Sequence, residues 1–418
     1  MRQSRLQLRA PGFSLIELMV AMVIGLIGMI IIFQVFEVSE GIRRTTTSGG
    51  DAQQNGTIAL YLMQRDLRNA GMGFNDTPYA GCSMAGYDST QAPTNFPAVA
   101  GAMPMVPVNI VTGAAATTPD QISVFYGGQG RVANATTLSS GMASPTDPLK
   151  VTNRFGYRLG DLVLLLQPGP PFQNCNFMEV TFLPTTLTVP PGPTDQVSHD
   201  ANATYTDVNG VTRNARFNPA GGLGIAYTGG ASTSPTTSRV FNLGNLYDAN
   251  AQPVYNTYAI ANNTLTVASA FSANPAAAVA DNIVHMRALY GMDDGQSTGT
   301  IVVTTSGDST YGYSPGVAGD GIVDRYIDST TFNAIAPLPW ASVIAVRIAV
   351  VARSATPETS SQGVGQPCDT TTVAPTWSGG VFDVSATAPA TPDANWKCYR
   401  YRVYETTIPL RNWIWKSS

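Results

Sequence analysis

Few residues in this sequence have the types and spacing that catalysis requires. The stretch GYSPG at 312–316 matches the G-x-S-x-G nucleophile elbow, in which the residue after serine donates its backbone N–H to the oxyanion. Here that residue is Pro315, which has no N–H. His199 lies in a polar loop and His285 in a strand-like run, and no HExxH zinc motif is present. We therefore predict that the protein is not an enzyme, with His199 solvated and His285 packed or at an interface.

A group of aspartates offers the other candidate chemistry. The segments YGMDDGQSTGTIVV and AGDGIVDRYID combine carboxylates with turn glycines, and oxygen-rich loops of this kind can bind Ca²⁺. The candidate ligands are Asp293, Asp294, Asp320 and Asp324, with Asp328 close by. The complete EF-hand spacing is absent, and Asp and Gly are also the usual residues of hairpin turns. We therefore expect two hairpin turns and no cofactor, with Ca²⁺ as the alternative.

The cysteines predict disulfides. Cys82, Cys175, Cys368 and Cys398 are widely spaced and form no CxxC pair. Behind the export signal described next, two structural disulfides are the default, and three connectivities are open. Cys368 and Cys398 flank a loop just before the last predicted strand. We therefore favour Cys368 with Cys398, and Cys82 with Cys175.

An acidic residue stands in an unusual place near the N-terminus. Residues 1–12, MRQSRLQLRAPG, carry three arginines and end in Gly12, and an apolar run follows from Phe13 to Phe36 with Glu17 inside it. The run is long enough for a helix to cross a hydrocarbon core of about 30 Å. A lone carboxylate there costs roughly 2.5 kcal/mol or more unless it has a partner. The segment predicts a membrane anchor whose glutamate needs a partner.

This leader, followed by G-F-S-L-I-E-L, resembles the class III signal of type IV prepilins and of type II secretion pseudopilins. The resemblance implies that a prepilin peptidase cleaves between Gly12 and Phe13 and that the new amino group of Phe13 is methylated. Cleavage would create an ammonium group one helical turn from Glu17, and in this family such groups pair between neighbouring subunits. Glu17 is therefore expected to be an assembly residue.

Further stretches resemble one branch of these proteins, the PilW family of minor pilins. That family shares a D-L-R-x-A-G segment followed by Gly-Cys, supplied here by Asp66, Leu67, Arg68, Ala70, Gly71, Gly81 and Cys82. The strand-like VIAVRIAVVAR and a closing L-R-N, here Leu410, Arg411 and Asn412, also resemble it. The resemblance covers both ends of the chain and leaves the long middle unmatched.

The elements that must position these residues follow from periodicity. Residues 13–70 predict a long N-terminal helix, with 13–36 in the membrane or filament core and a weak point at the glycine-containing residues 39–50. From 71 to 418 we expect a loop-rich, mainly antiparallel β head, with a half-exposed last strand. The better strand candidates are 121–126, 161–167, 177–183, 264–271, 282–292, 342–354 and 398–412. The expected fold class is α+β and type IV pilin-like.

Composition agrees with an extracytoplasmic structural protein. Charged residues make up 12% of the chain, against roughly 25% in typical soluble proteins, and the net charge of −4 calls for no nucleic-acid partner. The resemblance implies a Gram-negative minor pilin, held by one span in the inner membrane with its head in the periplasm. It would then join a pilus-tip complex that primes assembly and supports adhesion, twitching motility or DNA uptake. The implied partners are other minor pilins, the major pilin, the prepilin peptidase and a large tip adhesin.

Two alternatives remain open. A minor pseudopilin of a type II secretion system shares the leader, the helix and the assembly logic. In the second alternative the head binds a ligand directly, as a Ca²⁺-dependent adhesin or a DNA-binding tip subunit. The closing WKCYRYRVYETTIPLRNWIWK mixes bases with aromatic residues, as single-stranded DNA binders do. The alternation of an exposed strand face explains the same mixture.

Overall fold

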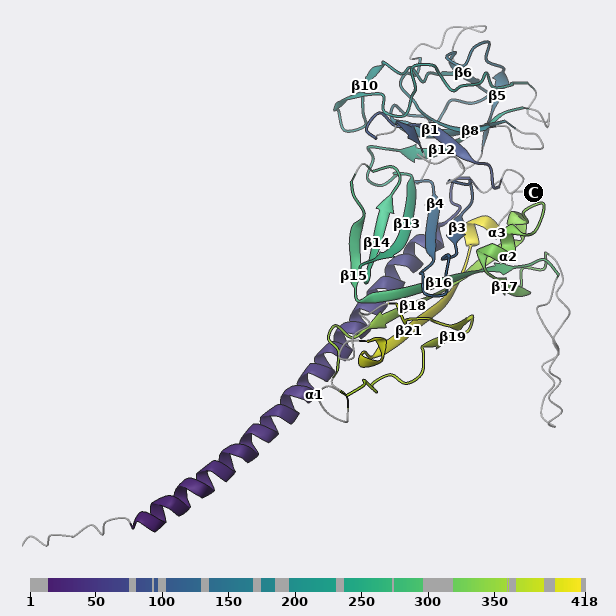
Figure 1. Ribbon diagram of the computed structural model, residues 1–418. Coiled ribbons are helices and arrows are strands. Elements are labelled where there is room, and N and C mark those ends of the chain that lie inside the picture. The colour runs from purple at the N-terminus through teal and green to yellow at the C-terminus, as the bar shows by residue number, and fades with distance from the viewer. Residues whose placement is uncertain are drawn as a thin grey trace, which may run out of the picture.

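The protein forms one long helix and a head of three main β-sheets (Figure 1). The computed structural model describes residues 14–74, 80–91, 94–96, 103–128, 135–167, 174–184, 195–230, 237–272, 274–295, 319–358, 360, 366–386 and 395–414. The GYSPG stretch, Gly12 and Phe13 lie outside these ranges. The long helix and the mainly antiparallel head agree with the α+β, pilin-like fold predicted from the sequence.

Helix α1 (Leu15–Asn69) is continuous over 55 residues. The weak point expected at 39–50 is helical throughout, so that prediction is wrong. Glycines in a helix cost up to about 1 kcal/mol each, but they keep their N–H groups, whereas a proline would remove a hydrogen bond. No proline occurs between Phe13 and Pro78. The helix stops at Gly71, whose φ of +82° is the left-handed conformation that favours glycine.

The rear half of α1 packs on a four-stranded antiparallel sheet of order β17-β16-β18-β21. Its strands are β16 (Ile283–Met292), β17 (Arg325–Ile327), β18 (Val343–Arg353) and β21 (Tyr401–Pro409). All side chains of the apolar strand β18 except Arg347 are buried, as expected for a central strand. The helix contributes Ala59, Met63 and Leu67 to the core beneath this sheet.

Helix α1 partly covers the face of β21 that was expected to be exposed. The Tyr404 hydroxyl donates to the backbone oxygen of Gln53 at 3.2 Å, and Arg402 Nη1 donates to Gln53 Oε1 at 3.1 Å. A Cβ at Gly56 would lie 2.1 Å from the Tyr404 ring, so only glycine allows this approach. The alternation of residue types along β21 therefore reflects contacts on both faces of the strand more than exposure of one face to solvent.

A five-stranded antiparallel sheet of order β15-β14-β13-β4-β3 stands next to the first. Its strands are β3 (Val108–Val111), β4 (Gln121–Tyr126), β13 (Val254–Ala261), β14 (Thr264–Ser269) and β15 (Ala277–Asp281). The two-residue turn Asn262–Asn263 joins β13 to β14 with φ values of +52° and +59°, a geometry that asparagine tolerates. β15 lies beside α1 (Figure 1).

The third sheet has eight strands and lies at the end of the head far from the front of α1 (Figure 1). Its order is β2-β1-β8-β7-β12-β5-β6-β9. The strands are β1 (Met84–Tyr87), β2 (Asn95–Phe96), β5 (Thr136–Ser140), β6 (Leu149–Val151), β7 (Asp161–Gln167), β8 (Asn174–Glu179), β9 (Gln196–Val197) and β12 (Arg239–Asn245). Predicted strand 177–183 thus begins three residues earlier, as β8. This sheet lies in the long middle of the chain that the family resemblance left unmatched.

Short elements complete the described part of the head. Two hairpins, β10 (Thr204–Thr206) with β11 (Thr212–Asn214) and β19 (Thr376–Trp377) with β20 (Gly380–Val381), extend from the sheets. The helical turns are α2 (Ser329–Asn333), α3 (Arg411–Ile414) and the 3₁₀ turns Trp340–Ser342 and Trp396–Cys398. The disulfides join Cys82 to Cys175 and Cys368 to Cys398, which is the pairing favoured above.

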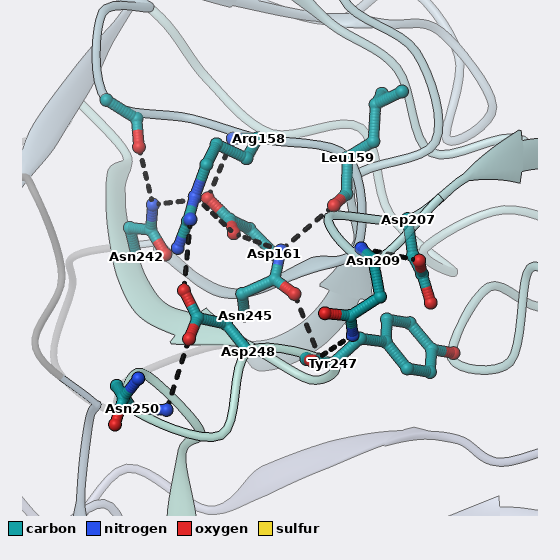
Figure 2. A network of polar contacts seen from close by, with 11 residues as sticks. Arg158, Leu159, Asp161, Asp207, Asn209, Asn242, Asn245, Tyr247, Asp248 and Asn250 are labelled. Atoms are coloured by element: carbon teal, nitrogen blue, oxygen red, sulfur yellow. Dashed lines mark hydrogen bonds and ion pairs between the residues drawn. The ribbon is translucent and has the colours of Figure 1, made fainter. Parts of the chain in front are cut away.

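A buried polar network joins the central strands of the eight-stranded sheet (Figure 2). Asp161 at the start of β7 accepts hydrogen bonds from Asn242 and Asn245 of β12, at 2.9 and 2.8 Å, and from the Arg158 N–H at 2.8 Å. Arg158 also pairs with Asp248 at 3.1 Å. Burial raises the pKa of Asp161, and the hydrogen bonds oppose that rise. Because the asparagines and the aspartate face each other at fixed positions, the network favours one strand register.

Both histidines are buried, so the expectation that His199 is solvated is wrong. His199 follows β9, and its Nε2 lies 2.9 Å from the Asp147 backbone oxygen. His285 packs against the Phe382 ring, and its Nε2 lies 3.1 Å from the Ala116 backbone oxygen. Burial lowers the pKa of each imidazole, because the charged form loses its hydration. The polar loop around His199 gave no sign of this long-range packing.

The lowered histidine pKa values predict a loss of stability in mild acid. Below about pH 6.5, the ordinary histidine pKa, the unfolded chain binds protons that the folded chain does not. The free energy of unfolding should therefore fall as the pH falls from 6.5 toward the folded-state pKa. We expect a His199→Gln and His285→Gln double variant to lose less stability between pH 7.5 and 5.5 in urea unfolding. An unchanged pH slope would contradict this assignment.

Candidate functional site

The front of α1 carries the predicted assembly residue. Gly12 and Phe13 lie outside the described residues, Ser14 has an extended backbone, and the helix begins at Leu15. Glu17 lies in the first helical turn and is exposed. A carboxylate there interacts favourably with the positive end of the helix and can be reached by a group on another subunit.

The surface around Glu17 is apolar on every side of the helix. Each large apolar side chain from Leu15 to Phe36 is at least 51% exposed, and the helix projects away from the head (Figure 1). The segment Leu15–Gly41 is long and apolar enough to cross a membrane. A helix that is apolar all round needs lipid or other apolar helices around it. The site can therefore move from a bilayer into a bundle of similar helices without exposing new apolar surface to water.

The D-L-R-x-A-G segment forms the joint between this helix and the head. Asp66 is buried, and its carboxylate accepts hydrogen bonds from the Tyr258 hydroxyl at 2.7 Å, the Asn256 amide at 2.8 Å and the Tyr126 hydroxyl at 3.3 Å. Burial, and next the Asp66 charge, raise the pKa of Tyr126 to about 12. Leu67 lies in the core beside it. The carboxylate thus ties α1 to β13 and β4.

The closing L-R-N segment meets the same joint from the other end of the chain. Asn412 Nδ2 lies 3.3 Å from the backbone oxygen of Arg68 and 3.2 Å from that of Asn69. These are carbonyl groups at the end of α1, which have no partner within the helix. Trp413 packs against Phe74 and donates its indole N–H to the Trp340 oxygen at 3.1 Å. Trp413 therefore anchors the head, whereas Trp415 lies outside the described residues.

The hydrogen-bond partners of Asp66 could not be identified from the sequence. Asn256 and Tyr258 alternate on β13, and the residues of this strand lie some 190 positions from Asp66. A polar residue at alternate positions of a strand is an ordinary pattern, so only the three-dimensional contact identifies these two. The signal available in the sequence was the D-L-R-x-A-G resemblance, which singles out Asp66 but names none of its partners.

Removing the Asp66 carboxylate should weaken the joint. In an Asp66→Ala variant the two tyrosine hydroxyls and the Asn256 amide lose their acceptor, so we expect the free energy of unfolding to fall by about 3 kcal/mol. Urea unfolding of the full chain in detergent measures this loss. Asp51→Ala is the control, because Asp51 is an exposed acid on the same helix. Equal stability of the two variants would show that the Asp66 contacts contribute little.

The candidate calcium ligands are engaged by groups of the head itself. Four of the aspartates accept hydrogen bonds from backbone N–H groups: Asp293 from Gly319 and Gly321, Asp324 from Asp294 and Gly295, Asp320 from Ile322, and Asp328 from Thr331. The fifth, Asp294, accepts from the guanidinium group of Arg325. In the described part of the chain, no group of three or more His, Cys, Asp or Glu residues could hold a metal ion. These contacts are the ones that Asp makes in turns and caps. The absence of a cofactor stays a prediction, with calcium binding as its alternative.

The basic residues of the closing segment also bind the head. Arg400 pairs with Glu358 through bonds of 2.6 and 3.0 Å, and Arg347 of the neighbouring strand lies 3.8 Å from Glu405. Arg402 contacts α1, as described above. These contacts hold the last strand against its surroundings and give Arg400 and Arg402 partners within the chain.

Comparison with protein families gives two matches. A family described as type IV pilus-assembly protein W matches residues 254–412, and one described as a prokaryotic N-terminal methylation motif matches residues 9–33. Neither the curated proteins nor the solved structures give a match. The first match begins with β13 and ends with Asn412, so it covers both Asp66 partners on β13 and the residue that contacts the end of α1. The second covers Gly12, Phe13 and Glu17. The two matches, one on the bare front of α1 and one on the strands that hold its rear, make both ends of the chain similar to those of a PilW-like type IV pilin.

Proposed function

We propose that this protein is a minor pilin that joins a complex at the pilus tip and primes polymerisation of the major pilin, as a non-enzymatic subunit. The observation that carries the proposal is the combination of a bare apolar helix with a large head of three main sheets. The eight-stranded sheet is stacked beyond the part of the head that holds α1 (Figure 1). Such a head would clash with neighbouring subunits along the regular shaft of a pilus, but the tip of the pilus has room for it.

The chain's own groups account for the assembly steps. The subunit waits in the inner membrane with its head in the periplasm, where the two disulfides can form. After cleavage behind Gly12, the ammonium group of Phe13 pairs with the Glu17 carboxylate of a neighbour in a low-dielectric setting. This pairing sets the stagger between adjacent helices. The partners are other minor pilins, the major pilin, the prepilin peptidase and a large tip adhesin, and the pilus serves adhesion, twitching motility or DNA uptake.

Processing gives the most direct test. We expect the chain expressed with a prepilin peptidase to lose residues 1–12 and to begin with a methylated Phe13, and the chain expressed without it to stay intact. Mass spectrometry of the N-terminal peptide distinguishes the two forms. Cleavage at another position, or no cleavage, would refute the proposal. Deletion of the gene separates the pilus from a type II secretion system, because loss of pili supports the proposal and loss of secretion alone supports the alternative.

A further inference from the structure

The edges of the three main sheets differ in how they are protected. Strand edges expose unpaired backbone groups, and proteins usually shorten, cover or cap them. β2 and β9 have two residues each, β17 has three, and β15 lies beside α1. On β3, the outward N–H groups of Ile110 and Thr112 donate to the Tyr290 hydroxyl at 2.7 Å and to Ser329 Oγ at 3.0 Å. Five of the six edges are therefore short, covered or capped.

β21 is the exception, with nine residues along one edge of its sheet. Leu410 donates to the Ile344 oxygen and Ser354 donates to the Arg400 oxygen, so the even-numbered residues of β21 bond to β18. The odd-numbered residues Val403, Glu405 and Thr407 direct their N–H and C=O groups away from β18. Among the described residues, no strand pairs with that side of β21.

The residues of this edge are suited to pairing with a further strand. The stretch from Arg402 to Ile408, RVYETTI, is rich in β-branched and aromatic residues. Pro409 stands at the next outward position, where it has no N–H to offer, and so limits the open edge to the residues before it. An added strand could use three N–H donors and three carbonyl acceptors between Val403 and Thr407.

We propose that the outer edge of β21 binds an extended strand from another subunit of the same pilus, by addition of that strand to the four-stranded sheet. The proposal rests on the proposed function, since it takes the occupant from the pilus. β21 lies against the rear half of α1, with Tyr404 over Gly56. The open edge therefore lies beside the same helix whose bare front would meet neighbouring subunits under the proposed function. Backbone hydrogen bonds would give affinity, and alternate side chains would give specificity.

A single backbone donor tests this edge. Glu405→Pro removes the outward N–H at its centre, while Tyr404 and Thr406 keep their hydrogen bonds to β18. Glu405→Ala is the matched control, because it removes the same carboxylate, with its contacts to Ser378 and Arg347, and keeps the N–H. The measurement is the amount of each variant that copurifies with sheared pili. We expect Glu405→Ala to lower incorporation into pili no more than about twofold and Glu405→Pro to lower it about tenfold or more. Equal incorporation of the two variants overturns the proposal.

Two measurements keep the test independent of folding defects. In the unmodified chain, hydrogen exchange of the 401–409 peptide should slow on incorporation into pili, and unchanged exchange would overturn the proposal. A photocrosslinking residue in place of the exposed Thr407 should join the chain to a different pilus subunit. A crosslink only to a second copy, or only within the chain, would overturn it. If the proposed function itself is wrong, the wild-type chain is not incorporated into pili, whether or not it is processed, which separates that failure from a failure of the edge.

Discussion

The Glu17→Ala variant is expected to be cleaved after Gly12 like the wild type and to enter pili about tenfold less, or worse. Cleavage depends on the leader, which the substitution leaves intact. In the proposed assembly, the ammonium group of a neighbour's Phe13 would lie in an apolar environment, where an unpaired charge is costly. Breaking a buried ion pair by removing one partner costs about 3–5 kcal/mol, which is more than enough for a tenfold loss. The readout is the amount of processed chain in sheared pili and in the membrane.

Two variants separate the charge of Glu17 from other effects. Glu37→Ala removes an exposed carboxylate from the same helix and should assemble normally. Glu17→Gln keeps a hydrogen-bonding side chain without the charge, so we expect it to behave like the alanine variant. Normal piliation by Glu17→Ala would refute the assembly role, and a processing defect would assign Glu17 to recognition by the peptidase.

Local patterns predicted the parts of the fold that are apolar over several turns or several strand residues. The helix follows from an uninterrupted run without proline, and β18 follows from VIAVRIAVVAR, because a strand buried on both faces must be apolar at nearly every position. β4 and β7 have the predicted bounds, and β16 and β14 lie within theirs. In β7, β16 and β18 most side chains are buried, so the residues of these strands themselves supply the burial that stabilises them.

The rest of the head depends on contacts between distant residues. The eight-stranded sheet contains strands of two or three residues, which are too short to show periodicity. Its β1 pairs in parallel with β8, close to the disulfide between Cys82 and Cys175. The burial of His199 has the same origin. These features arise when loops without local preference are held together by the sheet around them.

The candidate site divides in the same way. Gly12, Phe13 and Glu17 could be named from the resemblance of one short continuous stretch to prepilin leaders, because their expected chemistry depends on one cleaved bond and one helical turn. The joint at Asp66 could be found only as a resemblance. Its mechanism needs β13 and Asn412, which lie about 190 and about 340 residues away. Two stretches quoted for the same family are therefore two sides of one contact.

Loss of the Cys82–Cys175 disulfide should lower stability more than any other change considered above. The bond closes a loop with a sequence separation of 93, against 30 for Cys368–Cys398. Because each bond lowers the entropy of the unfolded chain, the first disulfide is expected to stabilise the fold by about 4.7 kcal/mol and the second by about 3.6 kcal/mol. Both sulfurs of the first pair are buried where the segment after α1 meets β8, so the Cys82→Ser and Cys175→Ser double variant also leaves two hydroxyls in an apolar core.

The matched control is the Cys368→Ser and Cys398→Ser double variant, which removes the disulfide of the shorter loop from a small cluster of buried residues, Cys368, Cys398 and Tyr399, outside the main core. Urea unfolding of both variants in detergent, with the other disulfide intact, compares the two losses. A larger loss for the second pair would contradict the loop argument. If the first loss dominates, the eight-stranded sheet and the joint on α1 are stabilised together through Cys82. A head that needs this bond to be fully stable would, under the proposed function, complete its oxidation before it assembles with other subunits.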